Sequence, residues 1–261
     1  MPQKNQESER KTPTNDSEKY SANKKNFRDI KPSGGIKVII PAYNEEDSIA
    51  KVIVEIPEIV QEIIVVSNNS TDATEENAKN AGATVLQEKR KGYGYACLKG
   101  MDYISKQENK PDIIIFLDGD YSDFPAELTK IIAPIIKENK DLVIGSRVKR
   151  WREKGSMTFP QIFGNWLATS LMKLFFNARF TDLGPFRAIK YDKLLELEMQ
   201  DKTYGWTVEM QLKALKKGFS YTEVPVHYKN RIGTSKVSGT VKGAIFAGIK
   251  ILGWIFKYSF K

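Results

Sequence analysis

The sequence predicts an α/β protein with a mostly parallel central sheet whose strands are joined by helices. From Ile36 onward, short runs rich in β-branched residues alternate with stretches of helical periodicity. That alternation is typical of parallel strands with crossover helices. The chain has 261 residues, of which 41% are hydrophobic, so it is long enough to bury a sizeable core.

Charge and composition exclude several classes of protein. The 41 Lys and Arg residues exceed the 32 Asp and Glu residues, which gives a formal net charge of +9. This excess suggests an anionic partner, such as nucleotide phosphates, a lipid surface or nucleic acid. One cysteine, Cys97, cannot form an intrachain disulfide, and one histidine, His227, cannot form a histidine-rich metal site.

Residues 1–35 are polar, mixed in charge and almost without aliphatic side chains. Such a segment cannot offset the entropy lost on ordering, so a disordered tail is expected. The tail also contains no apolar run typical of a secretory signal peptide.

Short apolar runs predict the strands in chain order, at residues 37–40, 62–66, 84–87, 112–117 and 142–144. A helix is expected between the first two strands, because apolar residues recur at helical spacing over 49–56, up to Pro57. A second helix is expected to start near Asp72, with Glu75 three residues on, and to end at Gly82.

Polar and acidic motifs follow three of these runs: PAYNEED after the first, SNNSTD after the second and DGDYSD after the fourth. In parallel sheets, ligands bind beyond the carboxyl ends of the strands. Asp118 and Asp120, separated by one glycine, can share a hard divalent cation such as Mg²⁺ or Mn²⁺. The alternative is an ordinary acidic turn, since Asp and Gly are both favoured in turns.

Six segments in order resemble the family 2 glycosyltransferases, in particular the dolichol-phosphate mannosyltransferase-like branch. They are VIIPAYNEE, IIVVSNNSTD, IIIFLDGDYSD, VIGSR, TDLGPFRA and RIGTSK, and the resemblance covers about residues 36 to 240. It implies a GT-A fold, a Rossmann-like three-layer α/β sandwich, over residues 36–236. It also implies a GDP- or UDP-hexose as nucleotide-sugar donor, and Mg²⁺ or Mn²⁺ held by Asp118 and Asp120.

The resemblance assigns roles residue by residue. Residues that match the family's nucleotide-sugar site are Pro41, Ala42, Tyr43, Glu45, Asn68, Asp72, Asp118, Gly119, Arg231 and Lys236. Residues that match its acceptor side are Arg147, Asp182 and Arg187, and the residues expected to carry catalysis are Asp120, Arg147 and Glu209. For several of them a structural role is an open alternative. Glu45 can favour a helix N-terminus, Asp72 can cap a helix, Arg147 can be an exposed arginine after a strand, and Glu209 can be a surface position on a helix. Arg231 and Lys236 can belong to a merely basic loop.

Two positions depart from the family's pattern. Ser67 stands where the second motif usually has an acid, which leaves the preference between uracil and guanine open. Ser122 stands where the dolichol-phosphate branch commonly has a glutamine near the metal, which suggests a weaker or more hydrated metal site.

The acceptor can be argued from chemistry. A lipid monophosphate, with a second pKa of about 6, is largely ionised at neutral pH and needs positioning more than a base. A hydroxyl acceptor would need a general base such as Glu209 or Asp123. Because Arg147 and Arg187 suit phosphate, a polyprenyl phosphate acceptor is favoured. A hydroxyl acceptor and a non-catalytic nucleotide-sugar binder are the alternatives.

The C-terminal segment, residues 237–261, predicts a basic amphipathic helix. On a helical projection, its four lysines fall within an arc of roughly 100°; they are Lys242, Lys250, Lys257 and Lys261. This pattern favours binding at a membrane interface, and residues 159–180 are a second, weaker candidate. Neither segment is a convincing transmembrane span, and ordinary packing or a homo-oligomer contact is the alternative for both.

These features together predict an enzyme on the cytoplasmic side, peripherally associated with the membrane. A nucleic-acid partner is not expected, because no recognised module is present and Asp118 and Asp120 would repel phosphate without a metal.

Overall fold

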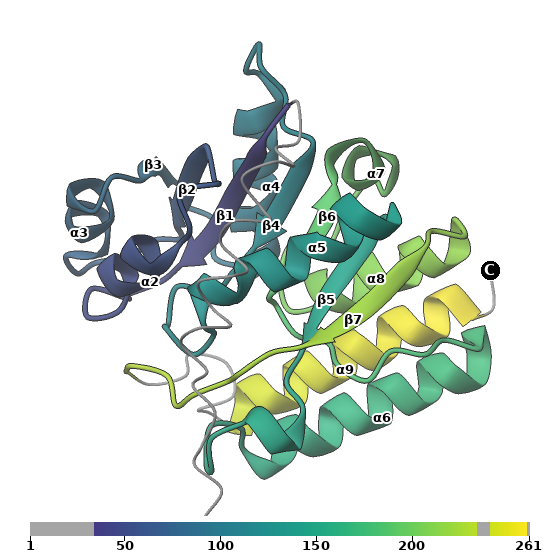
Figure 1. Ribbon diagram of the computed structural model, residues 1–261. Coiled ribbons are helices and arrows are strands. Elements are labelled where there is room, and N and C mark those ends of the chain that lie inside the picture. Colours follow the sequence, from purple (N-terminus) through teal and green to yellow (C-terminus); the bar gives the residue numbers. More distant parts are fainter. Residues whose placement is uncertain (1–33, 234–240, 260–261) are drawn as a thin grey trace, which may run out of the picture. The chain divides into compact units, whose positions relative to one another are not determined.

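The computed structural model describes residues 34–233 and 241–259, which belong to one compact unit. A seven-stranded sheet in the order β3-β2-β1-β4-β6-β5-β7 lies between two layers of helices (Figure 1). The strands are β1 (Ile36–Ala42), β2 (Glu62–Ser67), β3 (Thr84–Gln87), β4 (Ile113–Phe116), β5 (Leu142–Ser146), β6 (Arg187–Lys190) and β7 (Tyr221–Pro225). The helices are α2 (Ile49–Glu55), α3 (Thr74–Asn80), α4 (Tyr93–Ser105), α5 (Leu128–Glu138), α6 (Phe159–Phe176), α7 (Tyr191–Glu196), α8 (Trp206–Lys216) and α9 (Val241–Ser259), with short 3₁₀ turns η1 (Pro125–Glu127) and η2 (Lys149–Trp151).

The predicted fold class is confirmed, and the five predicted strands are present with ends within two residues of expectation. The strands β6 and β7 were not predicted. β6 has only four residues and a charged residue at each end, and it pairs antiparallel with both β4 and β5. β7 is a half-buried edge strand that ends in Pro225. Neither presents the continuous apolar run that marks a central parallel strand.

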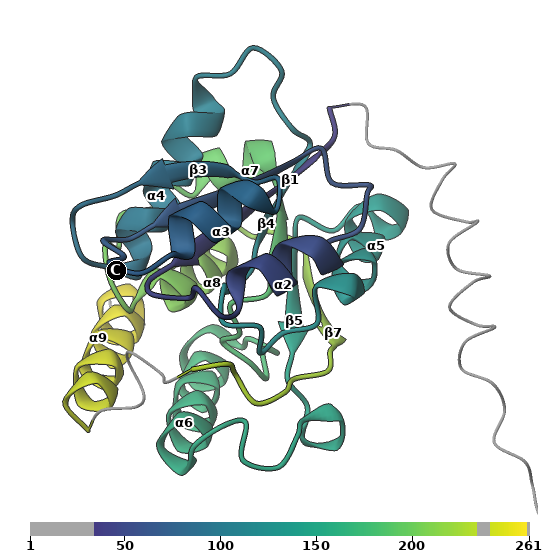
Figure 2. The same ribbon diagram turned by 90° about the vertical axis from the view of Figure 1, so that its left-hand side faces the viewer.

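The two helical layers follow from the alternation of side chains along each strand. Ile39 of β1 faces a core that contains residues of α4, α6, α7, α8 and α9. Its neighbours Val38 and Ile40 face the opposite core, which is built with α2, α3 and α5. The two views of the ribbon show the same division into layers (Figures 1 and 2).

The register of the sheet brings the polar segments that follow the strands to one edge. Ala42 at the end of β1 pairs with Ser67 at the end of β2, and Phe116 at the end of β4 pairs with Ile39. Since these strands are parallel, the chain leaves all three at the same side of the sheet, where the motifs described above begin.

Two helices differ from expectation. The helix after β2 starts at Thr74 rather than at Asp72, because Asp72 stays outside the helix and accepts hydrogen bonds from Thr74. The helix α9 is present, and its residues Trp254 and Ile255 are buried against the domain. Within the part of the chain that the structure describes, no helix is both long enough and apolar enough to cross a membrane. The tail over residues 1–33 and Lys236 lie outside the described residues.

Close packing places the loop at residues 200–205 against the start of α4. A Cβ atom added at Gly94 would lie 2.1 Å from the carbonyl oxygen of Asp201, so no larger residue fits there. The backbone N–H of Tyr95 donates to the carbonyl of Lys202 at 3.1 Å. This contact fixes the loop that covers one side of the cavity described next.

Candidate active site

A cavity of about 630 Å³ opens at the carboxyl edge of the sheet. Its lining includes eight of the ten residues expected at the nucleotide-sugar site, Pro41, Ala42, Tyr43, Glu45, Asn68, Asp118, Gly119 and Arg231, together with Asp120 and Arg147, which were expected to carry catalysis. They come from the segments after β1, β2, β4 and β5 and from the segment after β7. The fold therefore gathers into one cavity residues that are spread over most of the sequence.

Asp118 and Asp120 both line this cavity; Asp120 is buried and Asp118 is half-buried. The Oδ1 atom of Asp118 has no hydrogen-bond partner among the described residues. Burial, reinforced by the nearby charge of Asp120, raises the pKa of Asp118 to about 7. Asp120 Oδ1 accepts hydrogen bonds from the backbone N–H of Ser122 at 2.9 Å and from its hydroxyl at 2.5 Å.

The turn that carries these aspartates is strained at one position. Tyr121 has a φ angle of 63°, a left-handed conformation that is unfavourable for a bulky residue. The phenol of Tyr121 bonds to Glu55 on α2, which helps to hold the turn in place.

Arg231 links two sides of the cavity. One guanidinium nitrogen lies 3.0 Å from Glu45 Oε1, and another lies 3.1 Å from Asp120 Oδ2. The backbone N–H of Ile232 also donates to the carbonyl of Asp120 at 3.0 Å. The segment after β7 is thus tied to the acidic turn after β4.

Asn68 organises the loop that leads into α4. Its amide donates to the carbonyls of Glu88 and Arg90, and its oxygen accepts from the N–H of Gly92 at 2.8 Å. Within the same loop, the side chain of Arg90 contacts the Glu88 carboxylate at 2.7 Å and lowers the pKa of Glu88 to about 2. Lys91 and Gly92 of this loop and Tyr93, the first residue of α4, line the cavity.

Arg147 is held by a bidentate ion pair with Asp182. Its Nε and NH2 groups lie 2.9 and 2.5 Å from the two carboxylate oxygens, and its backbone N–H donates to Asp182 Oδ2 at 2.7 Å. Burial alone would lower the pKa of Arg147, but the charge of Asp182 outweighs this and keeps it above its ordinary value. The guanidinium also stacks 5.1 Å from the ring centre of Tyr228, so its direction is fixed.

Two residues expected at the reaction centre are buried outside the cavity. Arg187 is fully buried, and among the described residues its guanidinium donates to the backbone carbonyls of Leu183, Gly184 and Thr207. Glu209 is also fully buried: its carboxylate accepts from the N–H groups of Gln200 and Asp201 and pairs with Lys213. Neither residue lines the cavity, and the acceptor contact of Arg187 and the catalytic role of Glu209 stay predictions.

Asp72 is also turned away from the cavity, because its carboxylate accepts from the N–H of Glu46 and from Thr74. Asp123, the other carboxylate considered as a base, is 2% exposed and does not line the cavity. Burial, with the nearby charge of Asp118, raises its pKa well above the ordinary value. Asp123 is therefore poorly placed to act as a general base on a group bound in the cavity.

Several cavity residues carry no motif that would have identified them. Trp206 and Tyr228 line the site as single aromatic residues, and the N–H of the Trp206 indole is buried without a partner among the described residues. Helices α6 and α9 form an apolar end of the cavity, lined by Pro160, Gly164, Ala247, Gly248 and Ile251. In the sequence, these positions are marked by small residues and a proline on a helix, and such residues are too common in other helices to indicate a cavity.

Comparisons with known proteins agree with this arrangement. Residues 37–197 match the family described as glycosyl transferase family 2. An uncharacterised glycosyltransferase of Mycobacterium tuberculosis is 32% identical over 215 residues, which cover 81% of this chain and 94% of the relative. A dolichyl-phosphate hexose transferase of Haloferax volcanii is 28% identical over 216 residues, which cover 80% of this chain and 89% of that protein.

The fold also matches solved structures of glucosyl-3-phosphoglycerate synthase from Mycobacterium tuberculosis. The complex of that enzyme with Mn²⁺, UDP and glucosyl-3-phosphoglycerate has a TM-score of 0.69 and 20% sequence identity, and the match covers 88% of this chain and 81% of the other. Together with the family match over most of the sheet, this likeness identifies the chain as a GT-A-fold enzyme that belongs to glycosyltransferase family 2.

Proposed function

We propose that the protein transfers a hexose from a nucleotide sugar to a polyprenyl phosphate, with inversion at the sugar carbon. The observation that carries this proposal is the set of charged residues around the cavity. Asp118, Asp120 and Arg147 line it, whereas the two candidate bases for a hydroxyl acceptor, Glu209 and Asp123, do not. The relative named dolichyl-phosphate hexose transferase supports the same class of acceptor.

A phosphate acceptor suits this site because it needs no base. An oxygen of the dianionic phosphate attacks the anomeric carbon of the sugar, and the bond from that carbon to the donor diphosphate breaks. The electron pair of the broken bond leaves with the nucleoside diphosphate. No proton has to be removed, so the reaction needs neither Glu209 nor Asp123 as a base.

The residues at the acidic turn fit a divalent cation. Asp118 Oδ1 is a buried carboxylate oxygen without a hydrogen-bond partner among the described residues. An oxygen in this state is available to bind a metal ion. In the described ranges no third His, Cys, Asp or Glu completes a cluster, so donor phosphates and water would fill the remaining positions. Mg²⁺ or Mn²⁺, held by Asp118 and Asp120, would neutralise the charge on the leaving diphosphate. Structures of glucosyl-3-phosphoglycerate synthase with Mn²⁺ or Mg²⁺ and UDP support this choice.

The donor is proposed to lie with its nucleotide against Pro41, Tyr43 and Asn68 and its diphosphate near Asp120 and Arg231. When the diphosphate binds, Arg231 can exchange a carboxylate partner for phosphate oxygens and so contact the donor. The complexes of glucosyl-3-phosphoglycerate synthase with UDP-glucose support a UDP-hexose, and a GDP-hexose is the alternative.

We also propose that the enzyme works peripherally at the cytoplasmic face of a membrane. The apolar end of the cavity lies between α6 and α9, beside the Pro160, Gly164 and Gly248 positions, and gives a polyprenyl chain an apolar surface. The same two helices expose large apolar side chains, among them Phe159, Trp166 and Ile249. Exposed aromatic residues next to lysines are typical of interfacial helices.

The test is a panel of UDP- and GDP-hexoses incubated with Mn²⁺ or Mg²⁺ and a short-chain polyprenyl phosphate in detergent. We expect one donor to yield both nucleoside diphosphate and glycolipid, and Asp120→Asn to lower turnover by on the order of 10³-fold. The control is Asp47→Asn, because Asp47 is an exposed carboxylate that does not line the cavity. Transfer only to hydroxyl acceptors, or equal activity of Asp120→Asn and Asp47→Asn, would contradict the proposal.

A further inference from the structure

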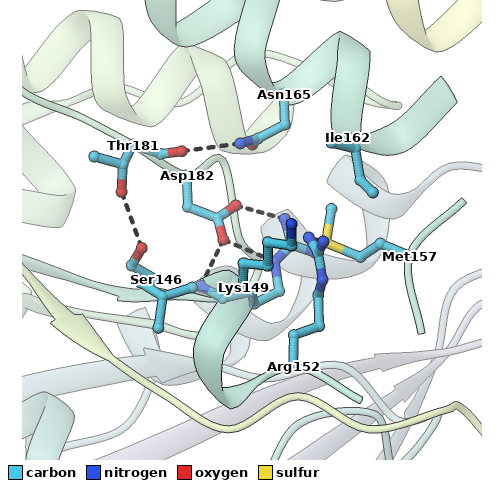
Figure 3. A pocket seen from close by; sticks show the side chains of 10 residues that line it. Ser146, Lys149, Arg152, Met157, Ile162, Asn165, Thr181 and Asp182 are labelled. Atoms are coloured by element: carbon cyan, nitrogen blue, oxygen red, sulfur yellow. Dashed lines mark hydrogen bonds and ion pairs between the residues drawn. The ribbon is translucent and has the colours of Figure 1, made fainter. Parts of the chain in front are cut away.

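A second, smaller cavity of about 250 Å³ lies beside the first (Figure 3). The two cavities share Arg147, Met157 and Asn165, so a group bound in the smaller one adjoins the larger one. Lys149 and Arg152, from the segment after β5, line only the smaller cavity. We call it the basic pocket.

The charge of the basic pocket is unbalanced. Three cationic side chains line it, and Asp182 is the one carboxylate in its lining. Asp182 is already paired with Arg147 through both oxygens. Figure 3 shows Asp182 bonded within the pocket and Arg152 directed toward Met157.

Lys149 and Arg152 are therefore the cations left for a ligand. Within residues 34–233 and 241–259, neither forms an ion pair, and the one side-chain hydrogen bond of Arg152 goes to the sulfur of Met157 at 3.2 Å. A thioether is a weak acceptor, so Arg152 keeps nearly all of its capacity to bind an anion.

The backbone that carries these two cations is fixed. Between them, the Trp151 ring stacks on the His227 ring with centres 4.9 Å apart and an angle of 8°. The carbonyl of Trp151 accepts from Tyr228 N–H at 3.1 Å, and the N–H of Glu153 donates to the carbonyl of Tyr228 at 2.8 Å. A pocket whose cations are held in advance loses less entropy when a ligand binds.

We propose that the basic pocket binds the phosphate monoester of the acceptor through Lys149 and Arg152. Arg147, neutralised by Asp182, acts as a wall between this phosphate and the donor cavity rather than as its main cation. This inference rests on the proposed phosphate acceptor and assigns the phosphate of that acceptor to the basic pocket. The same phosphate chemistry is offered by a lipid headgroup and by a soluble phosphate ester.

The test uses the double variant Lys149→Gln/Arg152→Gln and the matched control Arg150→Gln/Lys154→Gln. The control removes two positive charges from the same segment, but Arg150 and Lys154 are exposed and line neither cavity. Binding of glycerol 3-phosphate and of a short-chain polyprenyl phosphate in detergent is measured by calorimetry, with nucleoside diphosphate and Mn²⁺ present, and binding of the nucleoside diphosphate is measured separately.

We expect the double variant to bind phosphate monoesters at least about tenfold more weakly than the control, with unchanged affinity for the nucleoside diphosphate. In turnover, the KM for the acceptor should rise by a similar factor while the KM for the donor stays constant. Tighter binding of the polyprenyl phosphate would identify the lipid headgroup as the ligand, and equal binding of the two probes would identify the phosphate ester alone.

An equal loss of phosphate-monoester affinity in the double variant and the control would overturn the proposed role of the basic pocket, because a general loss of positive charge would then explain both results. An unchanged acceptor KM in the double variant, with glycolipid still formed, would also overturn it and leave the proposed function intact. If the wild-type protein forms product only with hydroxyl acceptors, the proposed function itself fails.

Discussion

Glu88 shows how a single residue shapes the donor cavity without entering it. Its carboxylate accepts from the backbone N–H and the side chain of Arg90, and its carbonyl accepts from Asn68. The loop so formed continues into Lys91 and Gly92, which line the cavity. Such bonds to an ionised carboxylate depend on pH.

Glu88→Gln should therefore lower stability in a pH-dependent way. The folded-state pKa of Glu88, about 2, lies below the ordinary 4.5, so its contribution is complete above pH 4.5 and is lost as the pH falls toward 2. We expect a midpoint of thermal unfolding about 2–4 °C below wild type at pH 7 and a smaller difference at pH 3, measured by circular dichroism. The exposed Glu76→Gln is the control, and an equal deficit at both pH values would contradict this account.

At the scale of elements, α9 is joined to the loop that covers the cavity. The Trp254 indole N–H donates to Asp201 Oδ2 at 2.6 Å, and Lys250 lies 3.3 Å from the same oxygen. Asp201 also accepts from the N–H groups of Thr203 and Gly205. Lys250 was expected on a basic face of the helix, but the structure directs it to this buried carboxylate.

Trp254→Phe should loosen this connection. The variant loses a hydrogen bond to a buried charged group, which costs about 2 kcal/mol of unfolding free energy. Because Thr203 and Tyr204 of the same loop line the cavity, we also expect a higher KM for the donor. Denaturant unfolding and steady-state kinetics check both effects. Tyr258→Phe is the control, since it keeps the ring that stacks on Trp254; a donor KM changed equally in both variants would contradict the role of the indole N–H.

At the scale of the whole molecule, α6 and α9 lie side by side on one face of the sheet (Figure 1). Both pack inward through part of their surface, as Met172 and Ile255 show, and expose apolar side chains outward. The ordinary packing considered for these helices is thus present on their inner sides. On the outer side of α6, the ring of Phe163 lies 5.8 Å from that of Trp166, and these side chains are 49% and 60% exposed.

Phe163→Ser/Trp166→Ser should weaken binding to vesicles that contain anionic lipid. Two large apolar side chains are then lost from the surface that enters the interface, and we expect the partition coefficient to fall at least about tenfold. Vesicle sedimentation measures it. Val54→Ser is the control, because Val54 is 76% exposed but lies on α2, in the opposite helical layer. Equal vesicle binding by wild type and the double variant would exclude α6 as the membrane-facing element.

The sequence was sufficient to predict an element or a site residue where its local pattern and its tertiary role coincide. The strands β1, β4 and β5 were predictable because strands that are buried on both faces must be largely apolar along their length. The gathering of Pro41, Asn68, Asp118 and Arg147 was predictable because each lies at or just beyond the end of a strand, and parallel strands end at one edge.

Only the tertiary structure decided which way the remaining side chains turn. Arg187 and Glu209 belong to segments that match the family as well as Asp120 does, but their partners are backbone groups of other segments. Asp182, more than thirty positions away from Arg147, pairs with that arginine, whereas Lys149 and Arg152 line the basic pocket and are the cations proposed to bind a phosphate. Sequence patterns record spacing along the chain, whereas the available charge at a site depends on pairing between distant segments, and that pairing exists only in the fold.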